Sequence, residues 1–321
     1  MRILLTGSSG WLGRHLAPRL IKTGHEVTGL DVAKGKYTTV LGSVCDAKLV
    51  QSLFAESDIE VVIHSAALHK PDIARFAATD FVDVNVKGTL NLLEASAAAK
   101  HDRFIFTSTT SLMITKKIRA GVDGGATAAY WLNENSGPLC PRNIYGATKL
   151  AAEHLCHLYS DLHNLDIAIL RTSRFFPEDD DTLKSPHGAN LKANEFLNRR
   201  LDVSDAADAH IVALNSIQGL NCKTYILSAP TPFRRADCRS LATDAAAVIL
   251  RYFPRAGEIY ERHGWRLPDK IERVYDSSLV ERELGFRPTV DFASVLYALE
   301  SGDPLPFQHL PDYESPINSA T

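Results

Sequence analysis

The segment that most constrains the fold of this chain lies at its N-terminus, where a short apolar run meets closely spaced glycines. Residues 2–6, Arg-Ile-Leu-Leu-Thr, lead into the glycine turn, Gly7-Ser8-Ser9-Gly10-Trp11-Leu12-Gly13, and an amphipathic stretch follows over 15–23. This order predicts a strand, a tight turn and a helix. The glycines let the backbone approach a pyrophosphate, and the helix N-terminus offers free N–H donors and a positive dipole end. The segment therefore predicts a dinucleotide site.

An acidic residue supports this interpretation. A second apolar run, 26–30, delivers Asp31 eighteen residues after Gly13, where a carboxylate can hold the hydroxyls of an adenosine ribose. A carboxylate there repels a 2′-phosphate, so NAD is favoured over NADP. Three basic residues nearby keep NADP as the second possibility: Arg14, Lys34 and Lys36.

Tyr145 and Lys149 lie four residues apart in a stretch that is typical of a helix, so one face presents both side chains. A free tyrosine has a pKa of about 10, and an adjacent cation can lower it by roughly 1 to 3 units. Together with Thr109 upstream, the pair predicts carbonyl/alcohol redox chemistry with Tyr145 as general acid/base. The alternative is two residues on an exposed helix. The glycine turn and Asp31 favour the catalytic interpretation.

With these motifs the chain resembles the extended short-chain dehydrogenase/reductases of the NAD-dependent epimerase/dehydratase type, from residue 1 to about 300. Further matching segments follow in the family's order: Val61–Ala67, Asn85–Thr89, Phe104–Thr109 and Leu201–Ala207. The resemblance implies that Thr109 hydrogen-bonds the reacting oxygen, that Tyr145 exchanges its proton, and that Lys149 binds the nicotinamide ribose.

The resemblance also implies which residues contact the cofactor and the substrate. The cofactor set is Gly7, Ser9, Gly10, Trp11, Leu12, Gly13, Asp31, Ser43, Val44, Ala66, Ala67, His69, Asn85, Thr107, Tyr145, Lys149 and Thr172. The substrate set is Thr109, Thr110 and Arg174. Ser43 is a departure, because relatives usually have an adenine-contacting Asp there.

Alternating apolar runs and helical stretches continue to about Ile169, which is typical of an α/β fold with a parallel sheet wound on both sides. The expected strands are Ile3–Leu5, Val27–Leu30, Val61–His64, Phe104–Thr107, Ile167–Leu170 and Tyr225–Leu227. The family resemblance implies a Rossmann domain over 1–175, with a strand returning near 201–230. It implies a smaller substrate-binding part with a C-terminal tail over 176–321.

Composition agrees with a globular enzyme. The chain has 321 residues, of which 45% are hydrophobic and 23% are charged, so it can bury a large core. A net charge of −3 gives no support for nucleic-acid or anionic-membrane binding. There is no run of eighteen apolar residues, and we expect a soluble cytoplasmic protein. The five cysteines are odd in number and lack C-x-x-C spacing, so we expect reduced, mostly buried thiols and no metal site.

Three segments have less regular patterns. Residues 111–141 are rich in Gly and Ala before Tyr130-Trp131-Leu132, and they form either a lid beside the site or a surface excursion anchored by Trp131. Residues 302–321 are expected to be an extended arm or a frayed tail. By the resemblance, helices over 72–100 and 145–164 pair with their copies across a twofold axis, which predicts a homodimer.

The substrate region is short. About twenty residues, 178–197, stand where sugar-nucleotide relatives carry a longer segment, so we do not expect a UDP-sized pocket. Arg174 stands where relatives commonly have Asn. It either anchors an acidic substrate group, with Arg199 or Arg200 as helpers, or pairs with an acid such as Glu178 or Asp179. We expect the acid run 178–181 to be a solvated surface.

The residues after Thr109 narrow the reaction. Sugar 4,6-dehydratases carry an Asp-Glu pair where this chain has Thr110 and Ser111, so dehydration is disfavoured. We expect an NAD-dependent oxidoreductase acting on an alcohol or ketone of a small, polar, carbohydrate-like molecule. One alternative is an NAD-dependent sugar or sugar-nucleotide epimerase. The other is a dinucleotide-binding sensor without turnover, against which the intact catalytic residues argue.

Overall fold

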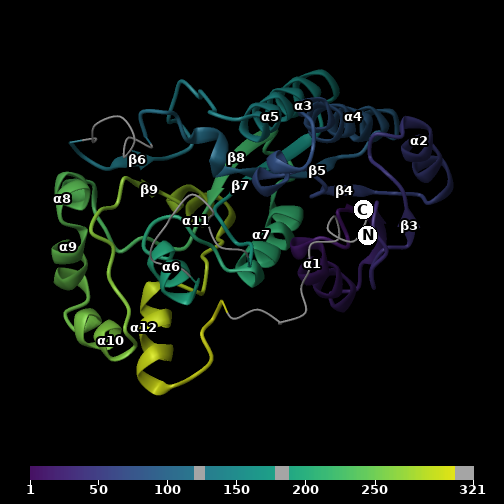
Figure 1. Cartoon of the computed structure of the whole chain (residues 1–321). Helices are drawn as coiled ribbons and strands as arrows, with labels where there is room; N and C mark the ends of the chain where they lie inside the picture. The colour runs from purple at the N-terminus through teal and green to yellow at the C-terminus, as the bar shows by residue number, and fades with distance from the viewer. Residues whose placement is uncertain (119–126, 178–187, 308–321) are drawn as a thin grey trace.

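The protein is built on one parallel sheet, in a computed structural model that describes residues 1–118, 127–177 and 188–307. Seven strands lie in the order β3-β2-β1-β4-β5-β7-β8, and their pairings are parallel. The strands are β1 Arg2–Thr6, β2 Glu26–Asp31, β3 Val40–Leu41, β4 Val61–His64, β5 Arg103–Thr109, β7 Asp166–Thr172 and β8 Cys222–Leu227. The predicted Rossmann-type α/β fold is confirmed (Figure 1).

The central strands form because they are apolar on both faces, as expected for a parallel sheet that helices cover on both sides. Leu4 of β1, Ile63 of β4 and Ile105 of β5 are each 0% exposed. All six expected strands are present. The short edge strand β3 was missed because two residues carry no periodicity.

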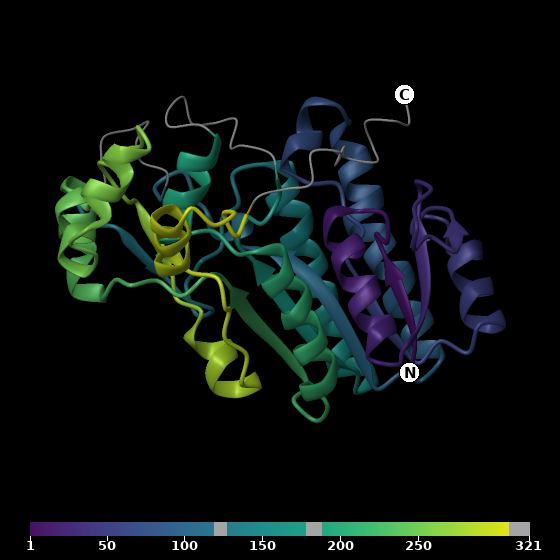
Figure 2. The ribbon, with the colours of Figure 1, turned by 90° about the horizontal axis from the view of Figure 1, so that it is seen from below.

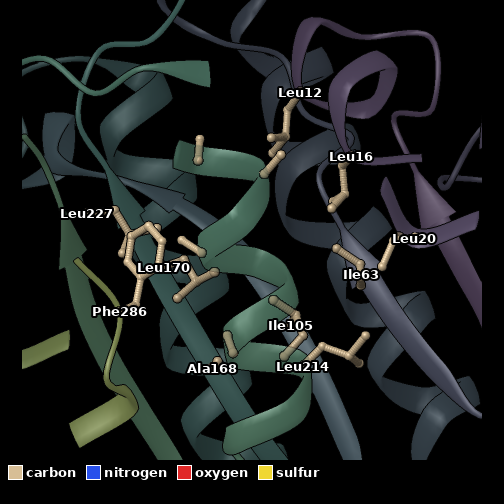
Figure 3. Packing of buried hydrophobic residues seen from close by; sticks show 14 of the residues in the cluster. Leu12, Leu16, Leu20, Ile63, Ile105, Ala168, Leu170, Leu214, Leu227 and Phe286 are labelled. Carbon is tan, nitrogen blue, oxygen red and sulfur yellow. The ribbon is translucent and has the colours of Figure 1, made fainter. Parts of the chain in front are cut away.

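Helices cover both faces of the sheet. In Figure 3, Leu12, Leu16 and Leu20 of α1 (Trp11–Lys22) follow one side of α7 (Val203–Ser216), whose lower end carries Leu214, and Ile63 and Ile105 of the sheet lie nearby. This face carries α1 Trp11–Lys22, α7 Val203–Ser216 and α11 Ser278–Leu284. The opposite face carries α2 Ala47–Glu56, α4 Gly88–Ala98 and α5 Ile144–His163.

The stretch 72–100, expected to be one helix, is several pieces. They are the 3-10 helix η1 Lys70–Ala74, α3 Ala78–Val82, the π-helical turn η2 Asp83–Lys87, and α4. The sequence pattern does not reveal these breaks, because they depend on side-chain hydrogen bonds. Asp72 caps η1 with its side chain, and Asn85, inside the π turn, bonds to another segment. Single π turns within helices are frequent at functional sites.

The second half of the segment 111–141 is mostly irregular where the structure describes it, as expected, but it contains one short strand that was missed. Strand β6 Tyr130–Leu132 pairs in parallel with β9 Arg273–Tyr275, far along the chain. Trp131 Nε1 donates to Asp276 Oδ2 at 2.9 Å, and the Arg235 guanidinium lies over its ring, which favours the anchor over the lid. Residues 119–126 lie outside the described part.

A second apolar core lies beyond the β8 edge of the sheet, where the green and yellow helices gather in both views (Figure 1, Figure 2). It is surrounded by α6 Gly188–Glu195, α8 Cys238–Thr243, α9 Ala245–Tyr252, α10 Ala256–Arg262 and α12 Phe292–Ser301. After α12 the chain returns, and Phe307 stacks on Phe196 with ring centroids 5.7 Å apart. The arm is therefore exposed over 302–304 and packs on the second core at Leu305–Phe307, and 308–321 lie outside the described residues.

The five cysteines are free, but the expectation that most are buried is wrong. Cys156 is buried, Cys140 is exposed, and the other three are intermediate. Among the described residues, no helix combines the length and the apolar character that crossing a membrane requires.

The glycine turn depends on two glycines for different reasons. Gly7 has a φ of +73°, which residues with a Cβ rarely adopt. A Cβ on Gly13 would lie 2.2 Å from the Gly7 carbonyl oxygen and 2.7 Å from Ser8 Cα. The first turn of α1 therefore packs directly on the turn between β1 and α1, as a dinucleotide-binding loop requires.

We predict opposite effects for the same substitution at two glycines. Gly13→Ala should lower the free energy of unfolding by about 1–3 kcal/mol, because the added methyl meets backbone atoms and the turn must shift. Gly257→Ala in α10 is the control, since its Cβ would meet a Leu250 methyl at 3.4 Å, an ordinary contact. It should cost nothing or gain up to about 1 kcal/mol. Urea unfolding measures both, and equal stabilities would contradict the close packing at Gly13.

Candidate active site

The predicted catalytic residues meet where the end of β5 faces the start of α5. Asn143 caps α5 by accepting from the Gly146 N–H at 2.9 Å, which fixes the first turn that carries Tyr145. The Thr109 side chain lies close enough to Tyr145 to act on the pKa of its hydroxyl. One turn later, Lys149 Nζ donates to the Thr107 carbonyl at 2.6 Å. The structure therefore brings the three predicted catalytic residues together.

Lys149 is a buried cation. Its residue is 2% exposed, and its ammonium lies 4.0 Å from the centroid of the Phe106 ring. Burial lowers the pKa of Lys149 to about 8, although the charges of Cys156 and Glu153 act in the opposite direction. An ammonium with this pKa is mostly charged at pH 7 and loses its charge as the pH rises through about 8.

The expectation that Lys149 lowers the pKa of Tyr145 is wrong for this structure. Burial raises the pKa of Tyr145 to about 12, and the Thr109 side chain offsets this in part. The nearby charge of Asp72 raises it further. The spacing correctly indicated one helical face, but it carried no information about burial. Tyr145 is therefore in its acid form at neutral pH.

The loop after β4 is tied to the catalytic helix through Asn85. The Asn85 side chain accepts from the Leu68 N–H at 2.9 Å and donates to the Leu68 carbonyl at 2.9 Å and to Thr148 Oγ1 at 3.0 Å. Asn85 is 1% exposed. Asn85, predicted to contact the cofactor, thus has a structural role: its side chain holds the loop that carries Ala66, Ala67 and His69 against α5.

His69 ends this loop and contacts two other segments. Its Nδ1 lies 2.8 Å from Asp72 Oδ2, and its ring meets Phe176 edge-on with centroids 4.6 Å apart. Burial acts to raise the pKa of Asp72, but the hydrogen bond and charge of His69, with the charge of Arg75, outweigh it and lower the pKa. Since Phe176 follows β7, the His69–Phe176 contact connects the ends of β4 and β7 on either side of β5.

The nucleotide end of the site is formed by the glycine turn and β2. Asp31 Oδ2 accepts from the Ser9 N–H and Oδ1 from the Ala33 N–H, each at 2.9 Å. An ionised carboxylate has further lone pairs for ribose hydroxyls. Gly10 caps α1 without a side chain, and the first turn of α1 contains no acid. A glycine turn that leads into a helix N-terminus, with a carboxylate held by two backbone N–H groups, fits NAD.

The remaining predicted residues lie along the same edge, with most of their polar groups engaged. Thr107 Oγ1 shares a 2.8 Å hydrogen bond with His210 of α7, on the sheet face opposite α5. Thr172 donates to the Ser108 carbonyl at 3.0 Å, and Thr110 donates to the Thr172 carbonyl at 3.3 Å.

Two further predicted cofactor residues, Ser43 and Val44, follow β3. Ser43 Oγ accepts from the Cys45 N–H at 3.1 Å, so its hydroxyl stabilises the local turn. The Val44 carbonyl accepts from Asn91 Nδ2 at 2.8 Å, and Val44 is 4% exposed. The two residues thus stabilise the turn after β3 and its contact with α4.

Arg174 belongs to a cluster of three guanidiniums around one carboxylate. Glu195, which is 2% exposed, lies 2.7 Å from Arg200 Nη1, 2.9 Å from Arg199 Nη2 and 3.8 Å from Arg174 Nε. The backbones of Arg174 and Arg200 form a parallel β-bridge. The structure therefore brings the three predicted arginines together, while the acid run 178–181 lies outside the described residues.

Comparison with known proteins places this site in a family. A model described as the NAD dependent epimerase/dehydratase family matches residues 3–226. The chain belongs to this family. The family is NAD-dependent and its curated relatives are enzymes, so the protein is an NAD-dependent enzyme.

Members of the epimerase/dehydratase family match the chain over most of its length. A dTDP-glucose 4,6-dehydratase from Streptomyces antibioticus is 28% identical, over 91% of this chain and 89% of the relative. A UDP-glucose 4-epimerase from Thermotoga maritima, solved with UDP-glucose, has a TM-score of 0.66 at 19% identity and covers 94% of this chain and 98% of its own. A mutated uronate dehydrogenase has a TM-score of 0.62 at 18% identity, with coverages of 99% and 96%. The predicted resemblance is confirmed.

Three buried carboxylates of this epimerase/dehydratase member were missed from the sequence. Glu153 stands eight residues after Tyr145, hence on the same helical face, and that spacing was a usable signal. Asp72 follows His69 by three residues and Pro71 by one, a pattern typical of a helix start. Glu195 stands four residues before Arg199, a helical spacing that was overlooked, and only its distant partner Arg174 is brought to it by the β-bridge.

Proposed function

We propose that the protein transfers a hydride between NAD and an alcohol or ketone of a small, polar, carbohydrate-like substrate. The observation that carries the proposal is the placement of Thr109, Tyr145 and Lys149 together at the end of β5. The reacting oxygen would lie within reach of two hydroxyls, those of Thr109 and Tyr145. Pure cofactor binding needs no such pair, so the arrangement supports turnover.

The residues divide the chemistry as follows. NAD, when bound, supplies the acceptor or donor of the hydride. Tyr145, protonated at neutral pH, donates its proton to the substrate oxygen during reduction and takes it back during oxidation. Thr109 holds that oxygen by a hydrogen bond. Lys149 orients the nicotinamide ribose, while Asp31 orients the adenosine ribose and disfavours the extra phosphate of NADP.

The small-substrate proposal rests on the short segment between β7 and α7. After Phe176 the chain reaches α6 and then returns to the sheet by the Arg174–Arg200 bridge within about twenty-five residues. No Asp-Glu pair follows Thr109; Thr110 and Ser111 carry hydroxyls, and a hydroxyl is a poor group for removing a proton from carbon. These features favour net redox over dehydration. The alternative is an NAD-dependent epimerase, which the solved 4-epimerases of the same fold support.

We predict that Tyr145→Phe loses about 10²–10⁴-fold in turnover, because the variant keeps the ring and loses only the proton that is transferred. NAD affinity should stay near that of the wild type. The assay incubates the protein with NAD and a panel of sugars, uronates and polyols, and follows NADH absorbance together with product isomers. NADH accumulation supports the dehydrogenase, whereas an isomerised sugar without NADH supports the epimerase. A near-normal rate in Tyr145→Phe would disprove the assignment.

Substrate charge is a second proposal. Three guanidiniums share the Glu195 carboxylate, and Arg174 and Arg199 keep 21% and 16% of their side chains exposed. Arginine binds carboxylates and phosphates in a fixed bidentate geometry. The similar fold of a uronate dehydrogenase agrees with an acidic substrate. We therefore propose that Arg174 anchors an acidic group of the substrate.

Arg174→Met should lower kcat/KM for an acidic substrate roughly ten- to a hundred-fold, since charge-assisted hydrogen bonds are worth about 1.5–3 kcal/mol. The matched comparison is glucuronate against glucose, measured for both proteins. Neutral substrate should barely be affected. Equal losses on both would show that Arg174 is a structural partner of Glu195, and the acidic-substrate proposal would then fail.

We also propose a homodimer formed through α3 and α5. Apolar side chains lie exposed on these two helices, with Val82 46%, Leu158 50% and Leu162 64% accessible. The helices pack against each other and lie side by side in Figure 1. An isologous interface needs one such patch per subunit.

Light scattering at micromolar concentration should therefore report twice the 35.3 kDa chain mass. Leu158→Glu with Leu162→Glu should give the monomer, because two charges would be buried in the interface. Leu250→Glu on α9, also an exposed leucine, is the control and should remain dimeric. A monomeric wild type would contradict the proposal.

A further inference from the structure

Glu153 holds the middle of α5 to two strands at once. The Arg171 guanidinium contacts both of its carboxylate oxygens, at 3.0 and 3.2 Å from Nε and 2.6 Å from Nη2. Ser108 Oγ donates to Glu153 Oε1 at 2.5 Å. Glu153 is 2% exposed and Arg171 is 5% exposed. One buried carboxylate thus joins α5 to β5 and β7.

This carboxylate continues the line of catalytic side chains. Tyr145, Lys149 and Glu153 stand at successive turns of one face of α5, four residues apart. Each meets a different one of three consecutive residues on β5, in the pairs Tyr145–Thr109, Lys149–Thr107 and Glu153–Ser108. This face of α5 therefore contacts β5 through three side chains. The contact at Glu153 also includes a buried ion pair with Arg171.

Stability alone does not account for an ion pair here. Replacing a buried ion pair with apolar residues of similar volume is often neutral or stabilising, because desolvation offsets the attraction. A bidentate pair instead fixes direction, since the planar guanidinium accepts one orientation of the carboxylate. What this pair fixes is the helix turn that follows Lys149.

We propose that Glu153, held by Arg171 and Ser108, is a positioning residue for Lys149 that keeps its ammonium directed at the nicotinamide ribose of NAD. The inference rests on the proposed role of Lys149 in cofactor binding. It adds a requirement to that role: Lys149 needs a buried, oriented carboxylate one helical turn later in α5.

The charge of Glu153 also bears on how long Lys149 remains an ammonium as the pH rises. The titratable groups that interact with Lys149 are Glu153 and Cys156 on α5 and His64 on β4, and Arg171 on β7 pairs with Glu153. Burial lowers the pKa of Lys149 to about 8, and Glu153 is one of two groups that oppose this. Removing its charge therefore moves the loss of the ammonium to lower pH.

NAD affinity measured by calorimetry between pH 6 and 9 tests the proposal without any substrate. In the wild type, affinity should be constant up to about pH 8 and fall above it, since the neutral lysine donates more weakly. Glu153→Gln should bind NAD roughly ten-fold more weakly at pH 7. Its affinity should begin to fall at lower pH than in the wild type. Glu134→Gln is the control, since Glu134 is a partly buried acid that accepts the Ile226 N–H, and it should leave binding unchanged.

A double variant guards against a simple folding defect. Glu153→Leu with Arg171→Met leaves no orphan charge, so it should melt near the wild-type temperature. It should nevertheless show the weakened affinity and shifted pH profile of Glu153→Gln. A stable double variant with the wild-type NAD profile would overturn the proposal.

Lys149→Met tests the proposed role of Lys149 separately from the proposed role of Glu153. It should bind NAD more weakly, with a flat profile over the same pH range. Unchanged affinity in this variant would refute the role of Lys149 itself, and with it the inference. Weakened affinity here, with normal binding in both Glu153 variants, would refute the inference alone.

Discussion

The contact on which the candidate site depends is the one between β5 and α5. Strand β5 is central and buried on both faces, so the sheet fixes its position. Its last residue, Thr109, pairs with the last residue of β7, Thr172. The helix begins at Asn143, where a single side-chain cap fixes the first turn. Chemistry that needs atoms placed to a fraction of an ångström is therefore built between two rigid elements, with the variable loops around them.

The same region concentrates buried charge. Asp72, Glu153 and Glu195 are each no more than 2% exposed, and each is paired with at least one arginine. Burying these charges costs free energy that the large apolar sheet can offset. In return, the polar groups define single orientations where apolar packing would allow several. The burial that holds the site together also raises the pKa of Tyr145 and lowers that of Lys149.

The parallel sheet was predictable because its strands are apolar runs, and apolar runs are visible locally. The catalytic face was predictable for a similar reason, since Tyr145 and Lys149 are separated by one helical turn. What could not be predicted depends on distant partners: the pairing of β6 with β9, the breaks before α4, and the burial that reverses the expected pKa of Tyr145. Glu153 was within reach of the spacing argument, but Arg171 was not, because β7 lies beside β5 only in the folded sheet.

The indole of Trp11 connects the two halves of the site. It belongs to the glycine turn, yet its Nε1 donates to the Phe175 carbonyl at 3.1 Å, just after β7, and its ring meets His15 at 4.7 Å. The other two tryptophans, Trp131 and Trp265, pack against the second core. Because the Trp11 ring contacts both the glycine turn region and the segment after β7, we expect its fluorescence to change when a ligand binds beside either one, without any added label.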